Sequence, residues 1–64
     1  MQERKFHLHL RLHNCVLHRH GRSHDIWLCH STRSETAVPR HREIPMGTVR
    51  AICKQLGIPI PSGR

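Results

Sequence analysis

The sequence predicts a small α+β fold in which a three-stranded antiparallel sheet is followed by a helix. Three short apolar segments separated by turn residues predict the strands, and one apolar stripe with helical spacing predicts the helix. The chain has 64 residues and should form one domain over 1–64. A chain of this size buries only about 60% of the surface that its unfolded form exposes. We therefore expect a shallow, exposed functional site.

The first segment, residues 6–13, fits two kinds of structure. Its apolar residues alternate strictly with polar ones, which is typical of a half-buried strand. It is also rich in Leu and Arg, which favour helix, and contains no β-branched residue. Asn14 would suit the left-handed position that ends a helix. The residues alone support helix and strand equally.

The middle of the chain predicts three strands joined by short loops. The first should end at the turn His20-Gly21, and the third should end at Pro39, which cannot donate a hydrogen bond to a neighbouring strand. Short loops favour an antiparallel meander. The strands are expected at residues 15–19, 25–29 and 36–38.

The last element is a helix over 48–56. Its apolar residues are spaced i, i+3, i+4 and i+7, and they are Val49, Ile52, Cys53 and Leu56. Gly57 and Pro59 should end it, leaving 58–64 as an extended or frayed tail. If the first element is also a helix, the order α-β-β-β-α is that of the double-stranded-RNA-binding domain, with both helices on one face of the sheet.

The charge of the chain indicates a polyanionic partner. Eleven Lys and Arg residues stand against four acidic ones, giving a net charge of +7 and a pI near 11.2. In a small domain this balance is typical of nucleic-acid binding. A membrane surface would require a helix with a wide apolar face, and residues 48–56 are too short for it.

The cysteines and histidines could serve as metal ligands or as core residues. Three widely spaced cysteines with no signal peptide before them predict small apolar core residues in a reducing cytoplasm. Five ligand-type residues cluster in the middle of the chain but lack the paired spacings of a structural zinc site: His18, His20, His24, Cys29 and His30. We therefore predict no metal and no cofactor, with a His-rich metal-binding protein as the minor alternative.

Two segments resemble a known family. The first segment is Gly21-Arg22-Ser23-His24-Asp25-Ile26-Trp27. The second runs from Ala37-Val38-Pro39-Arg40-His41 through Gly47-Thr48-Val49 to Gln55-Leu56-Gly57-Ile58. Both are similar to HicA-like toxins of bacterial type II toxin–antitoxin systems. The match covers nearly the whole chain. It implies a double-stranded-RNA-binding-domain-like fold and an N-terminal helix over 4–13. It also implies an mRNA interferase that works without a metal and is blocked by a HicB-type antitoxin, with DNA contacted only through that antitoxin.

The resemblance implies that His24 of the G-x-S-H turn is catalytic. Imidazole can act as acid or base near neutral pH, and Gly21 lets an RNA backbone approach closely. His41 is a candidate second proton-transfer group or phosphate contact. The full set expected to contact RNA is Arg19, Arg22, Ser23, Arg40, His41 and Lys54. Trp27 could stack on a base but is expected in the core.

The chain departs from the family pattern in its N-terminal half. Leu8, Leu10 and Leu12 cannot all face one side of a helix, Asn14 stands where a glycine is usual, and Cys29-His30 replaces Asn-Pro. These departures affect local packing rather than the histidine. The alternative function is a non-catalytic RNA-binding module of the same fold, although the last helix carries only Arg50 and Lys54 as basic residues.

Overall fold

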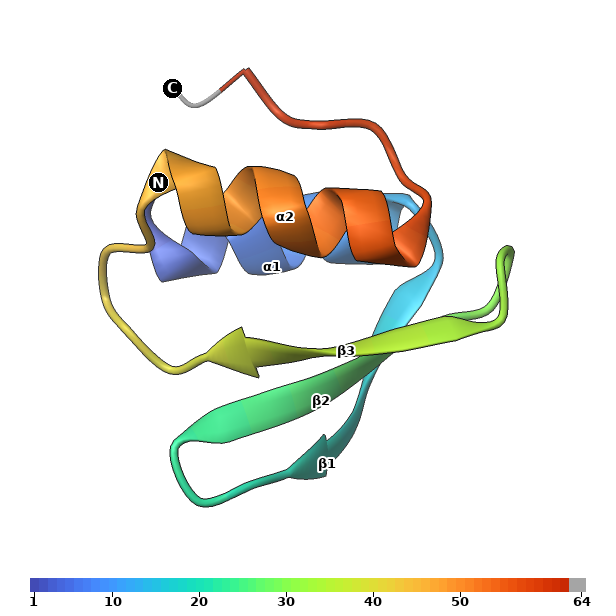
Figure 1. Ribbon diagram of the computed structural model, residues 1–64, viewed down its shortest axis with the longest axis horizontal. Coiled ribbons are helices and arrows are strands. Elements are labelled where there is room, and N and C mark those ends of the chain that lie inside the picture. The colour runs from blue at the N-terminus through green and yellow to red at the C-terminus, as the bar shows by residue number, and fades with distance from the viewer. Residues whose placement is uncertain (63–64) are drawn as a thin grey trace.

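The computed structural model describes residues 1–62 and has the order α-β-β-β-α (Figure 1). The three strands form one antiparallel sheet in the order β1-β2-β3. This confirms the predicted fold class, and it confirms a helix as the first element. Residues 63–64 of the predicted tail lie outside the described residues. The elements are α1 (Glu3–Leu12), β1 (Cys15–His20), β2 (His24–Cys29), β3 (Ser34–Pro39) and α2 (Met46–Leu56).

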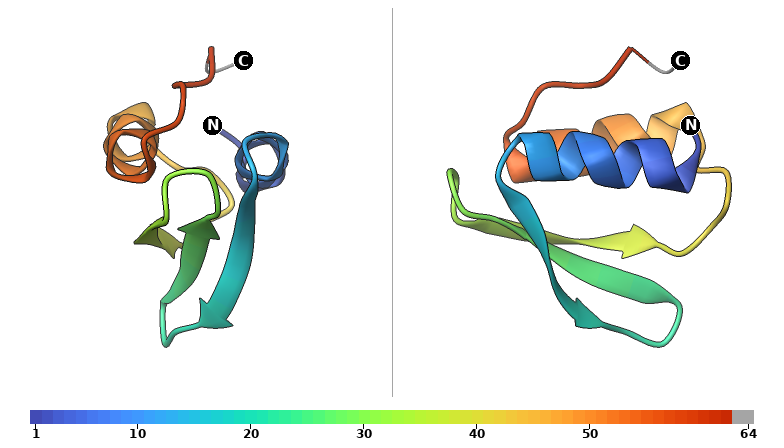
Figure 2. Two further views of the ribbon diagram at one scale, coloured as in Figure 1. Left: turned by 90° about the vertical axis from the view of Figure 1, so that its right-hand side faces the viewer. Right: turned by 180° about the vertical axis from the view of Figure 1, so that it is seen from behind.

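Both helices lie on one face of the sheet and leave the other face open (Figure 2). The alternation of side chains along the central strand β2 defines the two faces. Asp25, Trp27 and Cys29 are buried toward the helices, whereas the residues between them are exposed or half-buried. We call the uncovered side the open face. It carries His24 at one end of β2.

The apolar residues of α1 divide between a buried side and an exposed side of the helix. Phe6 and Leu10, four residues apart, are fully buried against the sheet, while Leu8 and Leu12 are 55% and 79% exposed. The alternation that resembled a strand is therefore a helix with one buried pair and one exposed pair of apolar residues. Asn14 follows with φ of 65°, the left-handed conformation expected of it at the helix end.

The core lies between the sheet and the two helices. Trp27 is 1% exposed and lies under α1, with its ring 4.9 Å from that of His7 and 5.7 Å from the Arg11 guanidinium carbon. Trp27 is thus a core residue, as predicted. The other buried apolar residues are Phe6, Leu10, Cys15, Cys29, Val38, Ile44, Val49, Ile52, Cys53 and Leu56.

Two sets of polar contacts tie the helices to the rest of the chain. The Thr32 hydroxyl in the β2–β3 loop donates to the carbonyl of Leu56 at 2.6 Å, next to Gly57, which has φ of 70° and ends α2. At the other end, the amino group of Met1 donates to the carbonyl of Ile44 at 2.7 Å. Within the described residues, neither helix has the length and hydropathy needed to span a bilayer.

The orientation of α1 can be tested with a matched pair of substitutions. Leu10→Ala should lower the free energy of unfolding by about 2–5 kcal/mol, because it removes a fully buried side chain and leaves a cavity. Leu12→Ala should change it by less than about 0.5 kcal/mol, because Leu12 is exposed. Urea denaturation measures both. Equal losses would contradict the helical placement of these leucines.

Candidate functional site at the β1–β2 turn

His24 is the first residue of β2 and its side chain is exposed on the open face. The turn before it is tight. The Gly21 amide donates to the His24 carbonyl at 2.7 Å, and a Cβ atom at position 21 would come within 2.4 Å of that same oxygen. A side chain at position 21 would therefore push the turn away from β2. Gly21 is required here by a close approach of the backbone.

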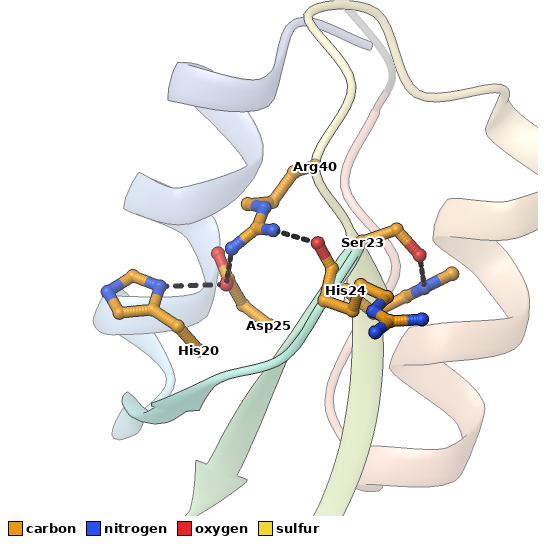
Figure 3. A network of polar contacts seen from close by, with 6 residues as sticks. His20, Ser23, His24, Asp25 and Arg40 are labelled. Carbon is orange, nitrogen blue, oxygen red and sulfur yellow. Dashed lines mark hydrogen bonds and ion pairs between the residues drawn. The ribbon is translucent and has the colours of Figure 1, made fainter.

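The imidazole of His24 has one neighbour from its own turn. The Ser23 hydroxyl oxygen lies 3.1 Å from His24 Nδ1 (Figure 3). This contact fixes the ring and occupies Nδ1, so Nε2 is the nitrogen available to a ligand. When the hydroxyl donates, the neutral ring carries its proton on Nε2; when Nδ1 donates, Nε2 has a free lone pair. The same geometry therefore suits a proton donor and a proton acceptor.

A buried carboxylate lies directly behind His24. Asp25 points toward the helices, and its Oδ1 accepts hydrogen bonds from His20 Nδ1 at 2.8 Å and from Arg40 Nη1 at 3.1 Å (Figure 3). Arg40 Nη2 also donates to the carbonyl of Arg22, and the Arg40 amide donates to the carbonyl of Ser23 at 3.3 Å. Asp25 and Arg40 therefore tie the turn to the end of β3.

The pKa of Asp25 is below its ordinary value. Burial alone would raise this pKa, because it disfavours the charged carboxylate. The hydrogen bond and charge of His20, together with those of Arg40, outweigh the burial. Asp25 is thus held as an anion. Its side chain and that of His24 point to opposite faces of the sheet, so the carboxylate positions the turn rather than contacting the imidazole.

Four of the six residues predicted to contact RNA lie in the turn, on β1 or directly after β3. Ser23 and Arg22 are exposed in the turn itself, and Arg19 is exposed on β1 opposite Ile26, on the same face as His24. Arg40 is close by but is held by Asp25 and the Arg22 carbonyl.

The remaining two predicted contacts lie at opposite ends of the sheet. His41 is exposed two residues after Pro39, the residue that pairs with His24. Lys54 is exposed in the last turn of α2, which contacts the β2–β3 loop. Lys54 is therefore at the far end of the sheet from His24. The structure brings Arg19, Arg22, Ser23 and His41 to the end that holds His24, and it does not bring Lys54 there.

The open face carries apolar residues along β2, with Arg19 opposite Ile26 and Glu35 opposite Leu28 as the charged residues beside them. Cross-strand pairing places Val16 beside Leu28, Ile26 beside Ala37, and Pro39 beside His24. Val16 is 41% exposed, Ala37 is exposed, and Ile26, Leu28 and Pro39 are half-buried. We call Val16, Ile26, Leu28, Ala37 and Pro39 the open-face strip. No helix of the described chain covers the strip, which leaves an apolar surface running from the catalytic candidate along the sheet.

Sequence reasoning missed the network around Asp25. The sequence indicates His20 only as one of five possible metal ligands. Within residues 1–62, no three His, Cys, Asp or Glu side chains are arranged to hold a metal ion. A signal was present, since aspartate is disfavoured in strands and Asp25 is one of only four acidic residues in a strongly basic chain. An acidic residue inside an apolar strand indicates a buried partner.

Comparison with known proteins places the chain in a family. A family model described as the HicA toxin of bacterial toxin–antitoxin systems matches residues 4–58. The chain is a member of the HicA toxin family. It is therefore a toxin of a toxin–antitoxin system, from a family of RNase-type toxins, and an antitoxin is its partner. No curated protein and no solved structure matches the chain.

The role of Asp25 gives a pH-dependent prediction. Because its folded-state pKa lies below the ordinary 3.8, the stabilisation from its ionised form is present above that value and is lost as the pH falls through the folded-state pKa. Asp25→Asn should lower the free energy of unfolding by about 1–3 kcal/mol at neutral pH. The difference from wild type should shrink below about pH 4.

Urea midpoints measured between about pH 7 and about pH 2 test this. Glu35→Gln is the matched control, because Glu35 is an exposed carboxylate of β3. A difference between wild type and Asp25→Asn that stays constant down to the lowest pH would contradict the ionised, bonded state of Asp25.

Proposed function

We propose that this HicA family toxin is an mRNA interferase that cleaves RNA through His24 without a metal ion. One observation carries the proposal: an exposed imidazole on the open face, fixed at Nδ1 by Ser23 and flanked by basic side chains, in a chain of net charge +7. The substrate we propose is mRNA in the cytoplasm. Membership of a family of RNase-type toxins supports the reaction class.

The proposed reaction uses the nucleophile of the substrate. The 2′-hydroxyl of RNA loses its proton and attacks the adjacent phosphorus, and the bond from phosphorus to the 5′-oxygen breaks. The products are a 2′,3′-cyclic phosphate and a 5′-hydroxyl. The protein has to move protons and stabilise the extra negative charge on the phosphorane. DNA lacks the 2′-hydroxyl and would not react.

In this proposal Nε2 of His24 carries out one proton transfer. Imidazole is the side-chain group that most often carries out proton transfer in enzymes. The hydroxyl of Ser23 orients the ring, and Gly21 allows the tight turn that presents it. His41, beyond the end of β3, is the candidate for the second proton transfer or a phosphate contact.

Positive charge near the turn would bind the phosphate. Arg19 is exposed on the same face as His24, and Arg22 is exposed in the turn before it; both are the proposed contacts to the non-bridging oxygens. Charge-assisted hydrogen bonds of this kind stabilise a phosphorane by several kcal/mol, roughly as one or two oxyanion-hole donors do. Arg40 contributes mainly by holding the turn, since its guanidinium already bonds Asp25 and the Arg22 carbonyl.

We propose that a HicB-type antitoxin covers the open-face strip and, with it, His24. The strip is apolar, uncovered and continuous with the catalytic candidate. A protein that buries it would exclude RNA from His24 by occupying the same surface. The charge of +7 on the toxin favours an acidic partner surface around the apolar contact.

Substitution of His24 tests the activity. With a defined mRNA in excess EDTA, wild type should cleave and leave cyclic-phosphate ends, and His24→Ala should be slower by roughly a hundredfold to ten-thousandfold. His30→Ala is the matched control, because His30 is an exposed histidine directly after the other end of β2. Salt-sensitive binding without cleavage by all three proteins would support the alternative, a non-catalytic RNA-binding module.

Substitution of Val16 tests the antitoxin surface. Val16→Asp puts a charge into the open-face strip at the end away from His24, so it should weaken antitoxin binding by at least about tenfold. RNA cleavage by the free toxin should stay close to wild type. Leu12→Asp is the control, because Leu12 is an exposed leucine of α1. Equal effects of both variants on the dissociation constant would place the antitoxin elsewhere.

A further inference from the structure

Two of the three cysteines are cross-strand neighbours. Cys15, the first residue of β1, pairs in register with Cys29, the last residue of β2. The adjacent pair is hydrogen-bonded, since the His30 amide donates to the Asn14 carbonyl at 2.9 Å. Antiparallel pairs alternate, so Cys15 and Cys29 form a non-hydrogen-bonded pair with Cα atoms about 4.5 Å apart. That separation lies within the range that disulfides span.

The two thiols also point to the same place. Cys15 Sγ lies 3.7 Å and Cys29 Sγ lies 3.6 Å from one acceptor, the carbonyl oxygen of His13. Both side chains face the helices and are at most 1% exposed. Both are free thiols. Register, side-chain direction and the shared acceptor therefore bring two sulfur atoms together at the end of the β1–β2 hairpin.

We propose that Cys15 and Cys29 form a reversible disulfide when the protein meets a peroxide. The Cys29 thiol loses its proton and its sulfur attacks one oxygen of hydrogen peroxide. The O–O bond breaks, the sulfur becomes a sulfenic acid, and the departing hydroxide takes up the proton to leave as water. The Cys15 sulfur then attacks the Cys29 sulfur, forms the S–S bond and expels the oxygen as a second water. The peroxide is reduced, and the two thiols are oxidised by two electrons in total. A dithiol reductant reverses the reaction by exchange.

The surroundings of the two cysteines give their thiols different acidities and therefore different roles in this reaction. Burial tends to raise the pKa of the Cys29 thiol, but its polar neighbours Thr32, Cys15 and the backbone of Ser31 outweigh the burial, and the pKa lies below the ordinary value. Burial raises the pKa of Cys15 to about 12. A hollow of about 330 Å³ lies at this end of the hairpin and is lined by Leu28, Cys29, His30 and Arg33. Cys29 is thus the residue that reacts first.

The disulfide would act on the hairpin that carries His24. It closes a ring from Cys15 to Cys29, which contains both strands and the whole turn at Gly21. Cross-linking a loop of this size raises the equilibrium constant for folding by about a hundredfold. In a reducing cytoplasm the pair stays as thiols. Oxidation would therefore convert a marginally stable small toxin into a more stable one.

The decisive experiment uses the unmodified wild-type chain. Treatment with hydrogen peroxide should lower its mass by about 2 Da, the two thiol hydrogens. Trypsin cuts after Arg11, Arg19, Arg22 and Arg33, so Cys15 and Cys29 fall in different peptides, and Cys53 falls in a third. The proposal expects one linked pair, residues 12–19 joined to 23–33, which dithiothreitol separates. It also expects a higher urea midpoint for the oxidised protein.

Single variants supply the controls. Cys53→Ser keeps the cross-strand pair and should still lose about 2 Da, whereas Cys15→Ser and Cys29→Ser should not. A link that includes Cys53, a link between two chains, or stepwise gain of oxygen without a link would overturn the proposal. An unchanged mass in folded wild type after prolonged exposure to peroxide would overturn it as well. No outcome depends on RNA cleavage, so the proposal stands apart from the proposed function.

Discussion

The alternation of side chains along β2 is the constraint on which the rest of the structure depends. Every second residue of this central strand, from Asp25 to Cys29, is buried under the helices, and the residues between them lie on the open face. A shift of one residue would bury His24 and expose Trp27. The same alternation places Asp25 behind the turn and Cys29 beside Cys15. Core, turn and site are consequences of a single register.

Burial of Asp25 carries a cost that the neighbouring residues offset. A carboxylate in a core this small would be strongly destabilising without partners. His20 and Arg40 provide them, and Arg40 then also bonds the Arg22 carbonyl. The Arg40 guanidinium is therefore bonded within the protein and is less available to a phosphate, and its bonds hold the turn in place. The basic surface at this end of the sheet is therefore partly structural.

The sequence predicted the elements more completely than the site. The spacing of apolar residues, every second residue in the strands and i, i+3, i+4, i+7 in α2, predicted these elements, because it shows which side chains are buried. Residues 6–13 stayed ambiguous because only contact with the sheet decides which leucines are buried. The distance of Lys54 from His24 and the hydrogen bond of Arg40 to Asp25 depend on which ends of the helices and strands meet in space. Neither is encoded in local spacing. The family resemblance made His24 the catalytic candidate, whereas the exposure of its side chain follows from the register.

The central claim is that RNA is cleaved by attack of its own 2′-hydroxyl, with His24 transferring a proton, and a single change in the substrate tests the attack most directly. An oligoribonucleotide cut at one mapped position by the purified toxin in excess EDTA is remade with 2′-deoxyribose at that nucleotide. The account predicts that cleavage at this position stops, while the all-ribose strand gives a 2′,3′-cyclic phosphate. Cleavage of the deoxy position at a comparable rate would contradict the account, because no 2′-hydroxyl would be present to attack.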